Sequence, residues 1–163
     1  MPNFAYLATD LYCPYCKGLV IDWVAFQWGY SPGYDVYPEW EYHLDDPIQW
    51  RRCSDGRVLP WTLFREGKYP HEVNLGDPRY MDVIIQAQRT FWWHEPSERP
   101  TCPACQSPLE GAAVQIRGGH IKRAWIYLPG ELAHDTDYWI GPNDELVAMP
   151  EWRDHPLNVV LDC

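Results

Sequence analysis

The sequence predicts a mainly β fold, in which an antiparallel sheet is clamped at its ends by two cysteine turns. Two observations predict this fold. The chain contains two matching Cys-Pro-x-Cys turns, and its β-branched and aromatic residues gather in short runs bounded by glycine and proline. With 163 residues the chain is long enough for a single domain with its own core.

The two cysteine turns are Cys13-Pro14-Tyr15-Cys16 and Cys102-Pro103-Ala104-Cys105. Two thiols separated by two residues can point the same way from one tight turn, and two such turns together present four thiolates at the corners of a tetrahedron. Proline after the first cysteine presets the turn, and Gly18 lets the backbone come close to a metal. The repeated motif therefore predicts a structural Zn²⁺ ion with four ligands: Cys13, Cys16, Cys102 and Cys105.

Two other interpretations of these cysteines compete with the metal site. Cys-Pro-Tyr-Cys is also the active-site tetrapeptide of glutaredoxins, where it opens a helix whose dipole lowers the pKa of a thiol. Here the run from Leu19 to Phe26 is β-branched and aromatic and lacks a helical period, and redox chemistry leaves the second turn unexplained. A pair of disulfides is the third interpretation. We favour the metal.

The extended segments follow from short β-prone runs between turn residues. Strands are predicted at residues 4–12, 18–28, 34–42, 58–64 and 81–93, and in a hairpin of residues 113–116 and 121–128. Asp22 interrupts an otherwise apolar face, and Pro38 confines its strand to a sheet edge or a bulge. The pair Gly118-Gly119 supplies the positive φ values that a tight hairpin turn requires.

Beyond residue 128 the composition becomes acidic, with Arg153 as the lone lysine or arginine after Gly130. This part contains the turn Gly141-Pro142-Asn143-Asp144 and a last predicted strand at residues 157–161. We therefore expect one domain over residues 1–163, with a β core at 1–128 and an acidic C-terminal extension at 129–163.

The charge and the aromatic content limit the classes of molecule that the protein is expected to bind. The formal net charge is −10, and the chain holds ten Trp, eleven Tyr and four Phe. The negative electrostatic field of such a chain disfavours a nucleic-acid partner and favours a basic protein, with aromatic residues as interface anchors. The plain alternative is that the acids keep the protein soluble and the rings fill the core. No signal peptide or membrane span is visible, and paired free thiols suit a reducing cytoplasm, so we expect a cytoplasmic protein without a membrane partner.

The pattern as a whole resembles a group of small bacterial zinc-ribbon proteins. The resemblance rests on the two knuckles, a Val-x-Phe-Gln-Trp-Gly segment, Tyr42, an Asp-Pro-Ile-x-Trp segment ending at Trp50, and a Val-x-Ile-x-x-Gly-x-Ile segment ending at Ile121. It implies a zinc-ribbon-like sheet, zinc on the four knuckle cysteines and a structural role for Trp50. The chain departs from the group's pattern in three features: Lys17 where glycine is usual, a long central region, and the extension after residue 128.

No catalytic set is recognisable in the sequence. The six histidines are scattered, His134-Asp135-x-Asp137 on an acidic tail is better explained as solvated surface, and no phosphate loop is present. Cys53 stands beside arginines but has no identifiable histidine partner. A zinc ion held by four thiolates has no open coordination position for water. We therefore expect no enzymatic activity.

The sequence favours an immunity-type inhibitor that neutralises a basic bacterial toxin or another basic protein, because acids steer a basic partner and rings anchor it. The predicted contact residues are acidic and aromatic side chains of one segment: Asp35, Tyr37, Glu39, Trp40, Glu41, Tyr42, Asp45 and Asp46. The acidic tail after residue 130 is a second candidate face. The alternatives are a zinc-ribbon accessory protein in a nucleic-acid machine and a thiol-redox protein.

Overall fold

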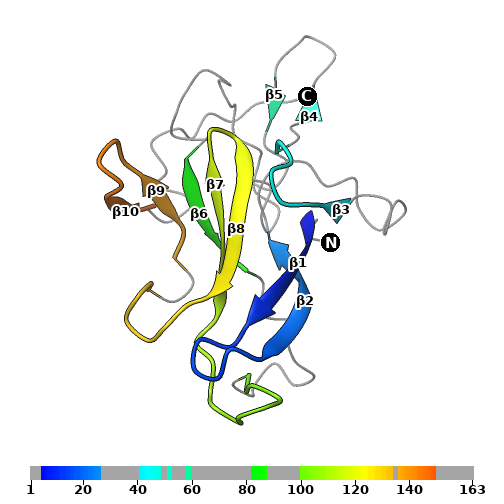
Figure 1. Cartoon of the computed structure of the whole chain (residues 1–163). Coiled ribbons are helices and arrows are strands. Elements are labelled where there is room, and N and C mark those ends of the chain that lie inside the picture. Colours follow the sequence, from blue (N-terminus) through cyan, green and yellow to red (C-terminus); the bar gives the residue numbers. More distant parts are fainter. Residues whose placement is uncertain are drawn as a thin grey trace, which may run out of the picture.

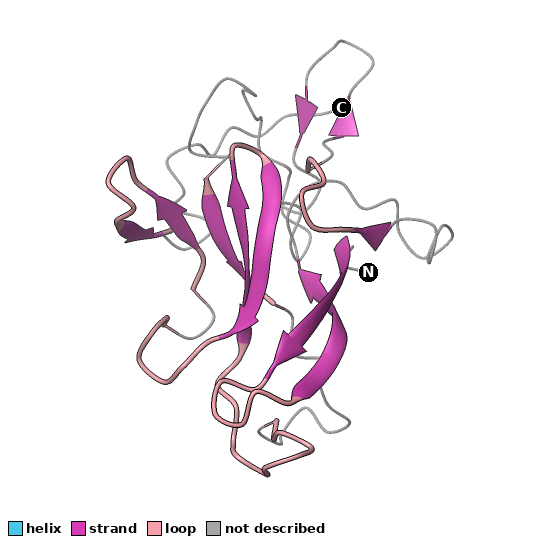
Figure 2. Cartoon of the chain, viewed as in Figure 1, coloured by secondary structure: helices cyan, strands magenta, loops and turns pink. Residues whose placement is uncertain are grey.

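The computed structural model of the chain describes residues 5–26, 41–48, 51–52, 58–59, 82–87, 100–133 and 136–149. Within these ranges every regular element is a β-strand and no helix occurs (Figure 2). The strands form sheets of three, five and two members, and nearly all of their pairings are antiparallel. The mainly β fold predicted from the sequence is thus confirmed. None of the described residues belongs to a helix long and apolar enough to cross a membrane.

The first sheet has the order β2-β1-β3. It contains β1 (Ala5–Tyr12), β2 (Leu19–Phe26) and the short β3 (Glu41–Tyr42). β1 and β2 form an antiparallel hairpin whose tip carries the first cysteine turn, and β3 lies parallel to β1 on its other side (Figure 1). These two long strands match the segments predicted at residues 4–12 and 18–28.

Irregular pairing inside this hairpin explains the exposure of Asp22. Ala8 pairs with Trp23, but the next pair joins Leu11 to Ile21, so the register shifts between them. A bulge of this kind changes which side chains face the core. Beyond it Val24 and Phe26 are fully buried as predicted, but Ala25 between them is buried as well, so the strand does not alternate there; Asp22 is exposed.

The second sheet has the order β10-β9-β6-β7-β8. Its strands are β6 (Val83–Gln86), β7 (Ala112–Arg117), β8 (His120–Ile126), β9 (Tyr138–Ile140) and β10 (Leu146–Ala148). Two further strands, β4 (Arg51–Arg52) and β5 (Val58–Leu59), pair with each other. The predicted Gly-Gly hairpin is confirmed, because Gly118 and Gly119 have φ values of 59° and 78° between β7 and β8.

The C-terminal extension contributes strands to the second sheet. β9 pairs with β6, and β10 covers the outer side of β9, with the predicted turn at residues 141–144 between them. The turn agrees with the prediction from the sequence, whereas neither strand was predicted, although each is a short apolar run beside the turn. The strands predicted at residues 34–40, 60–64 and 157–161 lie outside the described residues.

A buried polar network fastens the segment before β9 to the sheet. The side-chain amide of Gln86 donates to the carbonyl of Ala133 (3.2 Å), and its oxygen accepts from the hydroxyl of Tyr127 (2.8 Å). The backbone N–H of Gln86 donates to a carboxylate oxygen of Asp137 (2.9 Å). Because each of these contacts joins distant parts of the chain, Ala133 and Asp137 are held against β6.

The two larger sheets share one core. A bridge joins Phe26 to Ala87, and residues 45–48 run beside the start of β8, where the N–H of Asp45 donates to the carbonyl of Ile121 (2.7 Å). Side chains from both sheets fill the interior between them, among them Leu7, Leu11, Phe26, Ile85, Ile116 and Ile121, all fully buried. Their burial supplies the main favourable free energy of the fold.

Candidate metal centre

The first cysteine turn closes the β1–β2 hairpin. The N–H of Cys13 donates to the carbonyl of Gly18 (2.9 Å), and the N–H of Lys17 donates to the carbonyl of Cys13 (3.0 Å). Tyr12 and Leu19, on either side of the turn, are paired across the hairpin. The turn is therefore anchored at both ends by regular strands.

The second cysteine turn repeats the same backbone pattern. The N–H of Cys102 donates to the carbonyl of Ser107 (3.0 Å), and the N–H of Gln106 donates to the carbonyl of Cys102 (2.9 Å). Here the flanking residues Thr101 and Pro108 form an isolated bridge instead of two long strands. The local sequence thus sets the turn, since the same hydrogen bonds form on different supports.

The residue after each second cysteine has a left-handed backbone conformation. The φ of Lys17 is 66° and that of Gln106 is 62°, a region that costs an L-residue about 1–2 kcal/mol. Both side chains bend back onto the turn: Nζ of Lys17 donates to the carbonyl of Pro14 (2.8 Å), and Nε2 of Gln106 to that of Pro103 (3.2 Å). Glycine at this position would adopt the same conformation without that cost.

The two turns meet at one end of the molecule, where the loop after β1 lies beside the loop that precedes β7 (Figure 1). Sγ of Cys13 lies 3.7 Å from Sγ of Cys105, and Sγ of Cys16 lies 3.6 Å from Sγ of Cys102. All four sulfurs lie within 4.8 Å of one another. A tetrahedral ion with metal–sulfur bonds of about 2.3 Å requires sulfur–sulfur distances of ~3.8 Å, so the four thiols fit such an ion.

Hydrogen-bond donors surround the sulfurs. The backbone N–H groups of Tyr15, Gly18 and Ala104 each lie 3.4 Å from the sulfur of the cysteine two residues before them. Sγ of Cys105 lies 3.2 Å from the hydroxyl oxygen of Ser107, which donates to that sulfur once it is ionised. N–H and O–H donors stabilise thiolates and orient metal ligands, so this second layer suits four charged sulfurs.

The cluster is half enclosed. Cys13 and Cys102 are fully buried, while Cys16 and Cys105 are exposed. Gly18 lies where the turns touch, because a Cβ on it would stand 3.3 Å from Sγ of Cys16 and 3.5 Å from Cβ of Ala104. The expectation that glycine permits a close approach beside the cluster agrees with this contact.

The two exposed thiols differ in pKa. Hydrogen bonds from the side chain and then from the backbone of Ser107 lower the pKa of Cys105 to about 6. The N–H of Gly18 acts to lower the pKa of Cys16, but burial and the three neighbouring thiols outweigh it and raise that pKa to about 11. Without metal, Cys105 therefore ionises at a lower pH than Cys16. A metal ion must displace the proton of Cys16, so its affinity rises with pH.

The predicted partner-binding residues have different surroundings. Asp35, Tyr37, Glu39 and Trp40 lie outside the described residues. Glu41 is exposed, whereas the ring of Tyr42 is buried, 6.2 Å from that of Phe26, and so belongs to the core.

The two aspartates of the set already make contacts within the chain. A carboxylate oxygen of Asp45 lies 3.2 Å from Nζ of Lys122, and one of Asp46 accepts the backbone N–H of His43 (2.7 Å). Both contacts stabilise the segment that runs beside β8. A carboxylate oxygen of Glu41 lies 3.6 Å from Nε2 of His43, so each described acid of this set has a neighbour within the chain.

Sequence reasoning missed the supporting residues of the metal centre. Ser107, Lys17 and Gln106 are not cysteines, and no ligand motif points to them. Aligning the two turns on their cysteines pairs Lys17 with Gln106 and Gly18 with Ser107, which is the signal that would have found them. Comparisons with protein-family models, curated proteins and solved structures found no match to this chain.

Proposed function

We propose that Cys13, Cys16, Cys102 and Cys105 bind one Zn²⁺ ion as four thiolates and that this ion is structural. The support is the fit of the four sulfurs to a tetrahedron, together with the hydrogen-bond donors around them. Four thiolates suit zinc, and iron is the other common ion in such a set. Metal analysis of protein purified without chelators tests the identity, with one zinc per chain expected and an iron-coloured or metal-free protein contradicting it.

The pairing of the sulfurs favours metal over thiol-redox chemistry. In a redox Cys-x-x-Cys motif the two cysteines of one turn form a disulfide with each other. Here sulfur–sulfur contacts run between the turns, from Cys13 to Cys105 (3.7 Å) and from Cys16 to Cys102 (3.6 Å), so the four thiols form one group. Four-thiolate zinc is coordinatively saturated and leaves no position for a substrate or a water molecule. The metal then serves the fold, and we infer no enzymatic activity.

We propose further that the protein works in the cytoplasm as an immunity-type inhibitor, a binding protein that neutralises a basic partner such as a bacterial toxin domain. The support is the formal net charge of −10, to which a zinc ion with four thiolates adds two negative charges. Such a field accelerates association with a basic protein and opposes binding to a nucleic-acid backbone. The acidic segment with Asp35, Glu39 and Glu41 remains our predicted contact face.

Co-purification from the native source followed by mass spectrometry identifies the partner, which we expect to be a basic protein. The discriminating variant is Glu41→Lys, because Glu41 is exposed, and the matched control is Asp22→Lys, an exposed acid on β2 with the same charge change. β3 and β2 flank β1 on opposite sides. We expect Glu41→Lys to slow association by about tenfold at low salt and the control to change it much less.

Two outcomes contradict this proposal. Recovery of nucleic acid or of a subunit of a nucleic-acid machine as the main partner favours the accessory-protein alternative. Equal association rates for the two variants show that the segment around Glu41 is not the contact face. Trp40→Ala addresses the aromatic anchor separately, because an anchor in a desolvated pocket acts mainly on the dissociation rate.

A further inference from the structure

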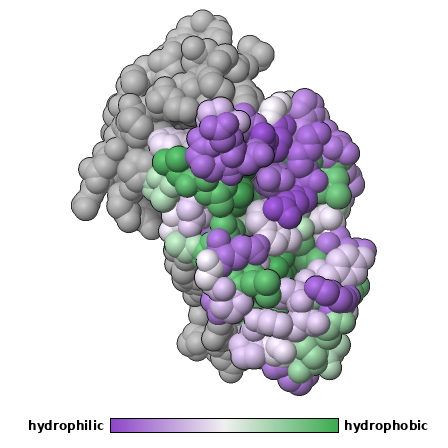
Figure 3. All heavy atoms as spheres, turned by 60° about the vertical axis from the view of Figure 1, so that its left-hand side comes forward, coloured by the Kyte–Doolittle hydropathy of each residue, from purple (hydrophilic) through white to green (hydrophobic). Residues whose placement is uncertain are grey.

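A hollow of about 560 Å³ opens on the second sheet, away from the cysteine cluster. Its floor is apolar and comes from three buried side chains, Ile84 on β6, Leu132 before β9 and Ile140 on β9. Leu146 on β10 adds an exposed apolar wall. Figure 3 shows this side of the molecule, where hydrophobic residues lie among hydrophilic ones. The size is within the range of sites that enclose small organic ligands, which is roughly 300–1,000 Å³.

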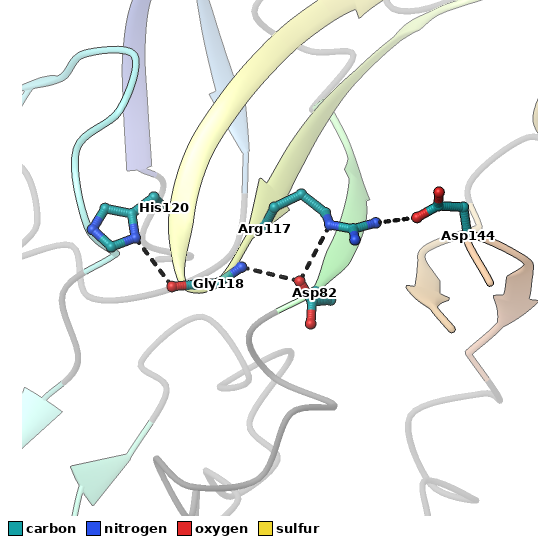
Figure 4. Close-up of polar contacts among 5 residues, drawn as sticks. All are labelled: Asp82, Arg117, Gly118, His120 and Asp144. Atoms are coloured by element: carbon teal, nitrogen blue, oxygen red, sulfur yellow. Dashed lines mark hydrogen bonds and ion pairs between the residues drawn. The ribbon is translucent and has the colours of Figure 1, made fainter. Parts of the chain in front are cut away.

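Three of the charged side chains around this floor are held by contacts within the chain. Arg117 reaches between Asp82 (3.4 Å) and Asp144 (2.8 Å), as Figure 4 shows, so its charge is neutralised by two carboxylates. A carboxylate oxygen of Glu131 accepts the indole N–H of Trp125 (2.9 Å). These contacts fix the rim in place and leave Arg123 as the remaining charged group of the lining.

Arg123 makes no ion pair with any residue that the structure describes, although the chain carries a net charge of −10. Its guanidinium carbon lies 3.9 Å from the centroid of the Trp125 ring. Stacking on the ring holds the guanidinium plane but uses none of its five N–H donors. The neighbouring Lys122 is paired with Asp45, so the two adjacent cations of β8 differ in this respect.

We propose that this hollow binds an organic carboxylate with an apolar body. The carboxylate pairs with the fork of N–H donors on Arg123, and the apolar body lies on Ile84, Leu132 and Ile140. A guanidinium pre-oriented by stacking suits two parallel hydrogen bonds to a planar carboxylate. A doubly charged phosphate is disfavoured, because Glu131 and Asp144 stand on the same rim and the net charge of the protein repels it.

The test uses 2-naphthoate as the probe and the neutral 2-naphthamide as its matched control, titrated into the full-length protein with its metal in place. Binding is followed by the NMR signal of the Trp125 indole N–H, assigned with Trp125→Phe. We expect a saturable shift with naphthoate and an affinity at least about fivefold lower for the amide, since the amide lacks the charge that Arg123 recognises. This comparison needs no change in the protein.

A pair of variants then isolates Arg123. Arg123→Met and Lys122→Met remove the same charge from adjacent residues of β8, but only Arg123 lines the hollow. We expect Arg123→Met to weaken naphthoate binding by about fivefold or more and Lys122→Met to leave it unchanged. The proposal is overturned by the absence of a saturable shift, by equal affinity for acid and amide, or by unchanged naphthoate binding in Arg123→Met.

Discussion

The two cysteine turns have the same backbone but stand on different supports. In both, the N–H of the first cysteine bonds to a carbonyl five residues on, and the residue after the second cysteine has a positive φ. The first turn closes a hairpin of two eight-residue strands, β1 and β2. The second is flanked by a single bridge between Thr101 and Pro108. The comparison teaches that the ligand geometry is local, whereas the stability of each turn depends on what it is attached to.

This difference assigns unequal roles to the two halves of the metal centre. The first turn is held by strand pairing before any metal arrives. Among the described residues the second turn is flanked by the Thr101–Pro108 bridge alone, so we expect its position to depend more on a bound metal and on the first turn.

Cys102→Ser removes a fully buried sulfur from the less supported turn. Structural zinc contributes roughly 10 kcal/mol or more in small peptides, which is comparable to the whole stability of a typical domain. We expect the variant to lose its metal and most of its resistance to urea. Cys105→Ser, at an exposed corner, is expected to lose less, because water can complete the coordination there. Metal content and urea unfolding check both, and a metal-loaded Cys102→Ser protein with an unchanged midpoint contradicts the prediction.

Removal of the metal with a chelator is expected to destabilise the two turns to different extents. After metal removal the amides of Cys102 and Gln106 should exchange hydrogen much faster than those of Cys13 and Lys17, since among the described residues only the Thr101–Pro108 bridge flanks the second turn. Hydrogen-exchange mass spectrometry with and without the chelator measures the difference. Equal deprotection of both turns indicates that the hairpin lends the first turn no stability of its own.

Thiol reactivity tests the electrostatic difference between the exposed sulfurs. At pH 7 the pKa of about 6 leaves Cys105 mainly as thiolate, whereas the pKa of about 11 leaves Cys16 as thiol. In metal-free protein we expect iodoacetamide to modify Cys105 at least about tenfold faster than Cys16, because the thiolate is the nucleophile.

Ser107→Ala is the matched variant for this experiment. Removing the hydroxyl raises the pKa of Cys105, so its alkylation at pH 7 slows while that of Cys16 does not. Peptide mapping of the alkylated protein checks both rates. If Ser107→Ala leaves the rate at Cys105 unchanged, the hydroxyl does not set the charge of that sulfur.

The smallest effect concerns the left-handed residues that the turns share. Lys17→Gly and Gln106→Gly relieve an unfavourable φ, which stabilises the folded state. Each also removes a side-chain hydrogen bond and raises the entropy of the unfolded chain, and both effects oppose the gain. The net stabilisation should therefore be no more than about 1 kcal/mol. Lys17→Ala and Gln106→Ala keep the strain and should be slightly destabilising. Urea unfolding compares the four variants, and a stabilisation by alanine equal to that by glycine rules out backbone strain as the cause.

Local patterns identified much of the fold in advance. The strands flanking the first turn, the Gly118-Gly119 hairpin and the turn at residues 141–144 follow from residue preferences over a few positions, and the structure has all of them. The burial of Tyr42 could not be predicted from local sequence, because a segment in which aromatic residues alternate with acids can equally well be exposed. Its ring is buried because β3 lies against β1, a contact between distant parts of the chain.

The chemistry of the candidate metal centre follows from local sequence, since each Cys-Pro-x-Cys turn carries its own backbone hydrogen bonds and offers its own pair of thiols. The meeting of the two pairs is a property of the tertiary structure, because Cys16 and Cys102 are 86 positions apart and no local preference spans that distance. The same holds for the hollow beneath Arg123. Its floor, its stacking partner and the charge of Arg123 come from three strands and a loop, and strand order is set by long-range packing that no single segment encodes.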